Sequence, residues 1–218
     1  MAGEKDIKAL RITDPSSSVF AASLEILRES ISPSEQLGDE KLRRLLERDD
    51  YRMYSLVMNA AVAATAILYL PKAEPFAWLD YMAVRPELRG RGLGSLLFQE
   101  LVKTATSEMP GASYLIFEVD DDRNDSTRLD SISRQRIEFY RRLGARLLSN
   151  AEYLFPSPTG PAVPMRLMVY RLRPGAELSQ ESLREALENI YQEIHGRKKD
   201  DPILRSTVDN LPSHLVLE

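Results

Sequence analysis

The sequence contains no cysteine and only two histidines, His195 and His214, both near its C-terminus. The absence of cysteine excludes disulfides, thiolate metal sites and a cysteine nucleophile. A catalytic triad or a metal cluster built on histidine is also not expected, because only these two histidines are present. We therefore expect no bound metal.

Long apolar runs and a basic charge excess are missing as well. The most apolar stretch, residues 60–70, is too short to cross a bilayer as a helix. The first six residues are polar and lack the apolar core of a signal peptide. A net charge of −4 provides no basic field for nucleic acid. These absences predict a cytoplasmic protein without a membrane or nucleic-acid partner.

The hydrophobic pattern predicts one domain in residues 1–173, followed by a C-terminal helix and a polar tail in residues 174–218. The tail from residue 196 is expected to be poorly ordered. Apolar periodicity predicts helices at 18–31, 39–48, 93–107, 132–143 and 179–195, and strands at 7–12, 51–58, 62–70, 76–84, 114–119, 145–148 and 165–172.

Residues 84–97 form the most informative stretch. An apolar run ends at Val84, three glycines follow at alternate positions, and an apolar-periodic helix begins near Leu93. The glycines are Gly90, Gly92 and Gly94, and the flanking cations are Arg85, Arg89 and Arg91. A strand, a glycine turn and a helix start together favour binding of a phosphate or pyrophosphate. The alternative is a helix-capping turn with solvated arginines.

Comparison with known phosphate-binding loops narrows the choice of ligand. The Walker lysine is absent, and a dinucleotide fingerprint would need glycine where Ser95 or Leu97 stands. The residues match Arg/Gln-x-x-Gly-x-Gly/Ala through Arg89, Gly92 and Gly94. This resembles the acetyl-CoA-binding loop of the GNAT superfamily of N-acyltransferases, and residues 80–84 resemble its central strand. The resemblance covers about residues 5–173.

The resemblance implies an α/β (α+β) fold with a mixed, mostly antiparallel central sheet, a central parallel strand pair and flanking helices. The C-terminal helix would be an extension of this fold. The resemblance also implies acetyl-CoA as acyl-donor co-substrate. The pyrophosphate would bind to the loop, and pantetheine would pair with the end of the central strand. The implied donor-binding residues are Met82, Ala83, Val84, Arg89, Gly90, Arg91, Gly92, Leu93, Gly94 and Ser95.

A second motif, residues 138–144, resembles the family's helix segment whose tyrosine meets the CoA sulfur. Tyr140 is therefore the predicted acid, since a phenol stays protonated at neutral pH and can donate to a thiolate. A core tyrosine is the alternative. Ser133 stands where many relatives carry a CoA-contacting asparagine. Arg136 is interpreted as reaching a CoA phosphate or an acceptor carboxylate, or as a solvated helix residue.

The predicted base is Asp80, with Glu118 as second choice and solvent as a further alternative. Strand alternation places Asp80 on the same face as Met82 and Val84. A structural carboxylate is the competing interpretation of Asp80. The acidic loop 118–125 could attract a cationic amine or simply be solvated.

The predicted function is direct transfer of an acetyl group from acetyl-CoA to a primary amine of a small molecule or a protein. The alternatives are a non-catalytic acyl-CoA-binding regulatory module and a nucleotide-binding protein with an atypical loop. The apolar stripe of helix 179–195 packs either on the domain or on a second copy, so a homodimer is one expectation.

Overall fold

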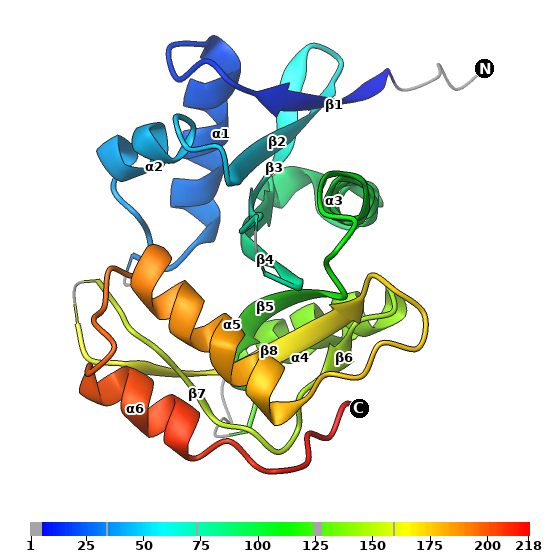
Figure 1. The fold of residues 1–218 in the computed structure, drawn as a ribbon. Helices are drawn as coiled ribbons and strands as arrows, with labels where there is room; N and C mark the ends of the chain where they lie inside the picture. The colour runs from blue at the N-terminus through cyan, green and yellow to red at the C-terminus, as the bar shows by residue number, and fades with distance from the viewer. Residues whose placement is uncertain (1–5, 34, 73, 124–127, 159) are drawn as a thin grey trace. The chain divides into compact units, whose positions relative to one another are not determined.

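The computed structural model describes residues 6–33, 35–72, 74–123, 128–158 and 160–218. The chain forms two compact units, and each contains both strands and helices (Figure 1). The first unit contains residues 1–73 and 77–110, and the second contains residues 74–76 and 111–218. The predicted domain boundary at residue 173 stays a prediction.

In the first unit β1, β2, β3 and β4 lie side by side in that order, and each neighbouring pair is antiparallel. The hairpin between β2 and β3 turns at Asn59 and Ala60, which both have positive φ. Its elements are β1 (Ile7–Ile12), α1 (Ser18–Ser30), α2 (Asp39–Leu45), β2 (Tyr51–Met58), β3 (Ala61–Tyr69), β4 (Phe76–Val84), the 3₁₀ turn η1 (Pro86–Leu88) and α3 (Leu93–Glu108).

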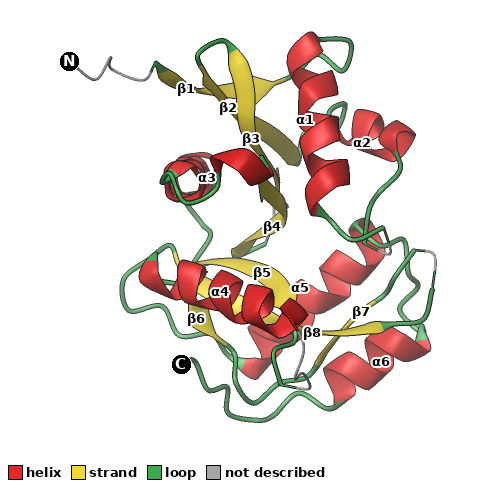
Figure 2. Cartoon of the chain, turned by 180° about the vertical axis from the view of Figure 1, so that it is seen from behind, coloured by secondary structure: helices red, strands yellow, loops and turns green. Residues whose placement is uncertain are grey.

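The helices of the first unit cover both faces of its sheet. α1 and α2 lie on one side and α3 lies on the other, as Figures 1 and 2 both show. The apolar stripe of α1 is buried at Phe20, Leu24 and Leu27. Buried hydroxyl groups join this helix to the sheet, because Ser23 Oγ lies 2.8 Å from Ser55 Oγ. Tyr51 and Ser55 share a face of β2, so Tyr51 also faces the α1–α2 side.

The second unit has β5, β8 and β6 side by side in that order, and β7 also pairs with β8. All of these pairs are antiparallel. α4 and α5 cover opposite faces of its strands (Figures 1 and 2). Its elements are β5 (Tyr114–Asp120), α4 (Arg128–Arg142), β6 (Arg146–Leu147), β7 (Tyr153–Phe155), β8 (Val163–Arg171), α5 (Gln180–Glu193) and α6 (Pro202–Asp209).

The predicted disorder of the tail is wrong. Residues 202–209 form α6, which buries Leu204 and Val208 beside α5 and β7. Asp201 caps α6 by accepting from the N–H groups of Ile203 and Leu204. Leu217 then pairs with Leu148. The polar composition of the tail hid this short apolar stripe. The strands expected from the sequence also leave out β7, which directly precedes a proline-rich stretch.

The two strands that the sequence predicts as the central pair are β4, in the first unit, and β5, in the second. β4 is the last strand of the first unit's series, and β5 is the first strand of the second unit's series. The turn, η1 and α3 follow β4 directly, as the sequence pattern predicts. None of the helices in the described part of the chain is long and apolar enough to cross a bilayer.

Candidate active site

The strand β4 carries a bulge at Asp80. Leu79 pairs with Leu68 of β3, and Tyr81 pairs with the adjacent Ile67, so Asp80 is the extra residue without a cross-strand partner in β3. Bulges bend a strand and redirect a side chain, and they are frequent beside active sites. The register resumes at Met82, Ala83 and Val84, which pair with Ala66, Thr65 and Ala64.

The bulge changes the face assigned to Asp80. The charge of Asp80 interacts with Lys41 of α2. The next residue, Tyr81, donates a hydrogen bond of 2.5 Å from its hydroxyl to the carbonyl of Glu35, between α1 and α2. Two successive residues thus have partners on the α1–α2 side. The strict alternation that grouped Asp80 with Met82 and Val84 does not hold through the bulge.

The carboxyl group of Asp80 lies in a poorly solvated place. Its Oδ2 atom is buried and has no hydrogen-bond partner among the residues that the structure describes. Burial raises the pKa of Asp80 to about 7, although the charge of Lys41 favours the ionised form. Burial in turn lowers the pKa of Lys41. A carboxyl group with a pKa near neutrality is suited to take up a proton at physiological pH.

The glycine turn leads from β4 into α3. Arg85 anchors its start by donating from Nε to the carbonyl of Val62 at 2.7 Å. Gly90 and Gly92 have φ of +74° and +82°, a conformation that favours glycine. An added Cβ at either position would meet no atom within 4 Å, so the turn needs glycine for its backbone angle and not for space. Arg89 and Arg91 are exposed around it.

The N-terminus of α3 completes an anion cradle. Gly92 is its N-cap, and the first helical hydrogen bond runs from the N–H of Leu96 to the carbonyl of Gly92 at 3.1 Å. The N–H groups of the residues before Leu96, Leu93 to Ser95, therefore face the helix start without an intrahelical acceptor. They combine with the positive end of the helix dipole, and Leu93 is buried and holds the turn in place. This arrangement fits a phosphate group.

The second unit positions Tyr140 on α4. Its side chain is buried. The centre of its ring lies 4.5 Å from the ring centre of Phe117 on β5 and 4.9 Å from that of Phe139. Burial raises the pKa of Tyr140 to about 12, so the phenol keeps its proton throughout the physiological range. Ser133, seven residues earlier on the same helix, is buried as well.

Arg136 does not extend freely from α4. Its Nη1 donates to Oδ2 of Asp120, at the end of β5, over 2.6 Å. Binding of Arg136 to a CoA phosphate or an acceptor carboxylate would require this ion pair to open, and that role stays a prediction.

Two aspartates of the acidic loop are engaged in ion pairs. Asp121 pairs with Arg123, and Asp122 pairs with the buried Arg166 of β8, each over 2.7 Å. Attraction of a cationic amine by this part of the loop is therefore weakened. Asn124 and Asp125 lie outside the described residues.

Glu118, the second candidate base, lies on β5 opposite Leu167 of β8. Its Oε2 atom is buried, and its charge acts on Tyr191 of α5. The sequence-predicted site residues thus fall into two groups, one in each unit: Asp80 with the β4–α3 turn, and Glu118 with the α4 residues. Sequence reasoning missed Lys41, Tyr51 and Tyr191 as neighbours of the candidate bases, because no local pattern links them. No group of metal-binding side chains occurs in the described ranges.

Comparisons with known proteins agree with this geometry. No curated protein matches the chain. A protein from Bacteroides thetaiotaomicron, described as an acetyltransferase of the GNAT family, has a similar structure with a TM-score of 0.67 and 20% identity, covering 88% of this chain and 99% of its own. The ribosomal-protein-S18-alanine N-acetyltransferase from Escherichia coli has a TM-score of 0.57 and 20% identity, covering 80% of this chain and 97% of its own.

A third structure carries the donor. A GNAT family acetyltransferase from Elizabethkingia anophelis with acetyl-CoA bound has a TM-score of 0.54 and 14% identity, and the match covers 77% of this chain and 99% of its own. These likenesses confirm the predicted fold class. The profile of the acetyltransferase (GNAT) family matches residues 21–145, more than half of the chain. This protein therefore belongs to the GNAT family of acetyltransferases.

Proposed function

We propose that the protein transfers the acetyl group of acetyl-CoA directly to a primary amine. The observation that carries this proposal is the continuous run from the bulged strand, where Oδ2 of Asp80 is buried, through the positive-φ glycine turn into the start of α3. This run joins a group suited to proton uptake to a cradle suited to a phosphate. Structures from Elizabethkingia anophelis and Arabidopsis thaliana that contain acetyl-CoA support the choice of donor.

The donor supplies the acetyl group, and the chain holds and orients it. The N–H groups of residues 89–95 bind the pyrophosphate in this proposal, and Arg89 and Arg91 add charge-assisted hydrogen bonds. The backbone of residues 82–84 pairs with the pantetheine arm. Holding the thioester in place converts the encounter with an amine into an effectively unimolecular step.

Two proton transfers accompany the reaction. Asp80 takes the proton from the acceptor amine, which frees the nitrogen lone pair to form the new C–N bond. The C–S bond breaks, and Tyr140 donates its proton to the leaving thiolate. The raised pKa of Asp80 and the protonated state of Tyr140 support these assignments. Glu118 is the alternative base.

The acceptor belongs to one of two classes. One similar structure is named an alanine N-acetyltransferase acting on a ribosomal protein, and another is named an aminoglycoside 6'-N-acetyltransferase. Protein amines and small-molecule amines therefore both have support. A cytoplasmic location and a homodimer stay predictions from the sequence.

Calorimetric titration with acetyl-CoA, ATP and NAD tests the donor site. We expect acetyl-CoA to bind and Gly92→Glu to abolish binding. Glutamate would be strained at the positive φ of this position, and its negative charge would stand at the anion cradle. Gly175→Glu is the matched control, since Gly175 also has positive φ and open space but lies in the other unit. Stronger binding of ATP or NAD would contradict the proposal.

Turnover is tested by thiol release from acetyl-CoA with a panel of protein N-terminal peptides and small amines. The protein contains no cysteine, so every thiol detected is released CoA. Tight acetyl-CoA binding without turnover for any amine would favour the non-catalytic binding module instead.

A further inference from the structure

The first unit contains a second buried oxygen without a partner, on the same side of the sheet as Asp80. This is the hydroxyl of Tyr51, the first residue of β2, whose side chain is only 3% exposed. Like Oδ2 of Asp80, the Tyr51 hydroxyl has no hydrogen-bond partner in the described part of the chain. The charge of Asp80 acts on this hydroxyl and, after burial, contributes to its raised pKa. Two buried oxygens without partners are thus electrostatically coupled.

The ring of Tyr51 is held firmly. The guanidinium of Arg48 lies 5.1 Å from the centre of the ring. The ring of Tyr69, the cross-strand neighbour of Tyr51 on β3, has its centre 5.1 Å away. Arg48 is itself fixed by Asp50 over 2.7 Å. The hydroxyl therefore has a defined position, which is a requirement for orienting another group.

A buried polar group costs free energy unless it forms a hydrogen bond. The two oxygens do not bond each other directly, although they are coupled and both lie on the α1–α2 side of the sheet. A water molecule can donate to a carboxylate and accept from a phenol, so one bridging water satisfies both groups.

We propose that Tyr51 is a positioning residue for Asp80, which it holds at Oδ2 through one bridging water molecule. The second carboxylate oxygen, Oδ1, is then left to take the proton from the acceptor amine. The inference rests on the proposed function, because it assigns Asp80 as the base. It adds a residue from β2 to the part of the site that β4 and the turn contribute.

The charges around Tyr51 and Asp80 determine in which direction removal of the Tyr51 hydroxyl shifts the pKa of Asp80. Lys41 from α2 lowers the pKa of Asp80, and burial raises it. Arg48 and the acidic groups of Asp50 and Asp80 act on Tyr51 in opposite directions. Donation from Tyr51 through water favours the ionised carboxylate. Removal of the hydroxyl must therefore raise the pKa of Asp80 further.

The test is a carbon-13 NMR titration of the free protein labelled at aspartate carboxyl groups, with the Asp80 signal assigned by Asp80→Asn. We expect Tyr51→Phe to raise the pKa of Asp80 by about one unit. Tyr54→Phe is the matched control, because Tyr54 lies on the same strand but three residues away and so on its other face. An unchanged or lower Asp80 pKa in Tyr51→Phe would overturn the inference.

Activity supplies a second readout. The acid limb of the kcat/KM profile should move to higher pH by the same amount in Tyr51→Phe, whereas the Kd for acetyl-CoA should not change. A shifted NMR titration with an unshifted acid limb would overturn the positioning role in catalysis. Failure of acetyl-CoA to bind would instead defeat the proposed function, and the NMR result would still decide whether Tyr51 holds Asp80.

Discussion

Asp80 carries a conflict between stability and chemistry. Its Oδ2 atom is buried, and its pKa is raised to about 7 because burial disfavours the charged form. A group that is more easily protonated in the folded chain than in the unfolded chain stabilises the fold at low pH. This contribution is lost as pH rises from the ordinary aspartate pKa of 3.8 through about 7. The protein is therefore expected to hold an ionised Asp80 at a cost in folding free energy.

The substitution Asp80→Asn tests this conflict directly. Relative to wild type, the variant should gain unfolding free energy as pH rises from about 3.8 to about 7. The gain should be of the order of 4 kcal/mol between about pH 3 and pH 8, since three pKa units are involved. Urea denaturation at a series of pH values measures it. At the same time kcat/KM should fall by about 10²- to 10⁴-fold, because the base is lost.

Asp14 provides a control of opposite sign. Its pKa is lowered by hydrogen bonds from Ser16, so Asp14→Asn should lose stability only above the ordinary aspartate pKa. If the unfolding free energies of wild type and Asp80→Asn change with pH in parallel, burial does not destabilise the ionised form of Asp80.

At the scale of secondary structure, glycines with positive φ mark the ends of two helices that carry candidate residues. Gly92 begins α3 and Gly144, with φ of +98°, follows the end of α4. The sequence predicts Gly144 as a helix-ending glycine, and the structure confirms it. Both residues fix how their helix joins the neighbouring strand, and hence where the candidate residues on that helix lie.

The substitution Gly144→Ala should destabilise the protein by about 1 kcal/mol or more, because alanine is strained at positive φ. The added Cβ would also meet the ring of Tyr170 at 3.4 Å. Gly111→Ala is the matched control, since Gly111 has neither positive φ nor a neighbour within 4 Å, and it should be neutral or slightly stabilising. Chemical denaturation compares the two, and equal effects would contradict the explanation.

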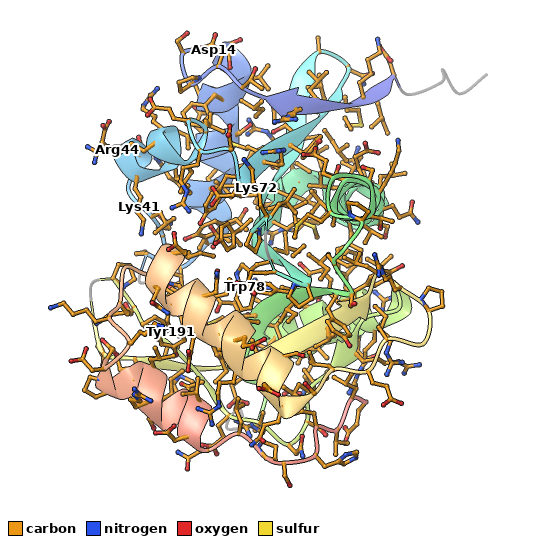
Figure 3. All side chains as sticks on the ribbon, viewed as in Figure 1. Asp14, Lys41, Arg44, Lys72, Trp78 and Tyr191 are labelled. Atoms are coloured by element: carbon orange, nitrogen blue, oxygen red, sulfur yellow. The ribbon has the colours of Figure 1, made fainter. Side chains whose placement is uncertain are left out.

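At the scale of the whole molecule, the C-terminal segment is part of the second unit. α5 buries Leu183, Leu187 and Ile190 completely, and its Tyr191 (Figure 3) donates to the carbonyl of Leu154 on β7. The final residues add the pair between Leu148 and Leu217. The segment thus covers a sheet face whose apolar side chains would otherwise meet water.

A chain that ends at Arg173 should lose the fixed packing of the second unit. We expect loss of near-ultraviolet circular dichroism, binding of a hydrophobic dye and no cooperative thermal transition for this unit. A chain that ends at Leu211 keeps α5 and α6 and should still unfold cooperatively, at a somewhat lower temperature. An intact cooperative transition after truncation at Arg173 would show that residues 1–173 fold alone.

Much of the fold follows from short-range patterns in the sequence. The stripe of α1, the Asn59–Ala60 turn, the glycine turn at 90–94 and the end of α4 depend on residues close together along the chain. The family motif and the candidate residues Asp80 and Tyr140 are also visible in the sequence, because backbone angles and helix starts require particular residue types locally.

Tertiary structure decided the features that depend on distant partners. The bulge that turns Asp80 toward α2 exists only in the pairing of β4 with β3. The ion pair of Arg136 with Asp120, the packing of α6 against α5 and β7, and the effect of the Asp80 charge on Tyr51 likewise join residues far apart in sequence. Burial and charge at a side chain are sums over such neighbours, so the sequence determined which groups were available and the fold determined their pKa values and partners.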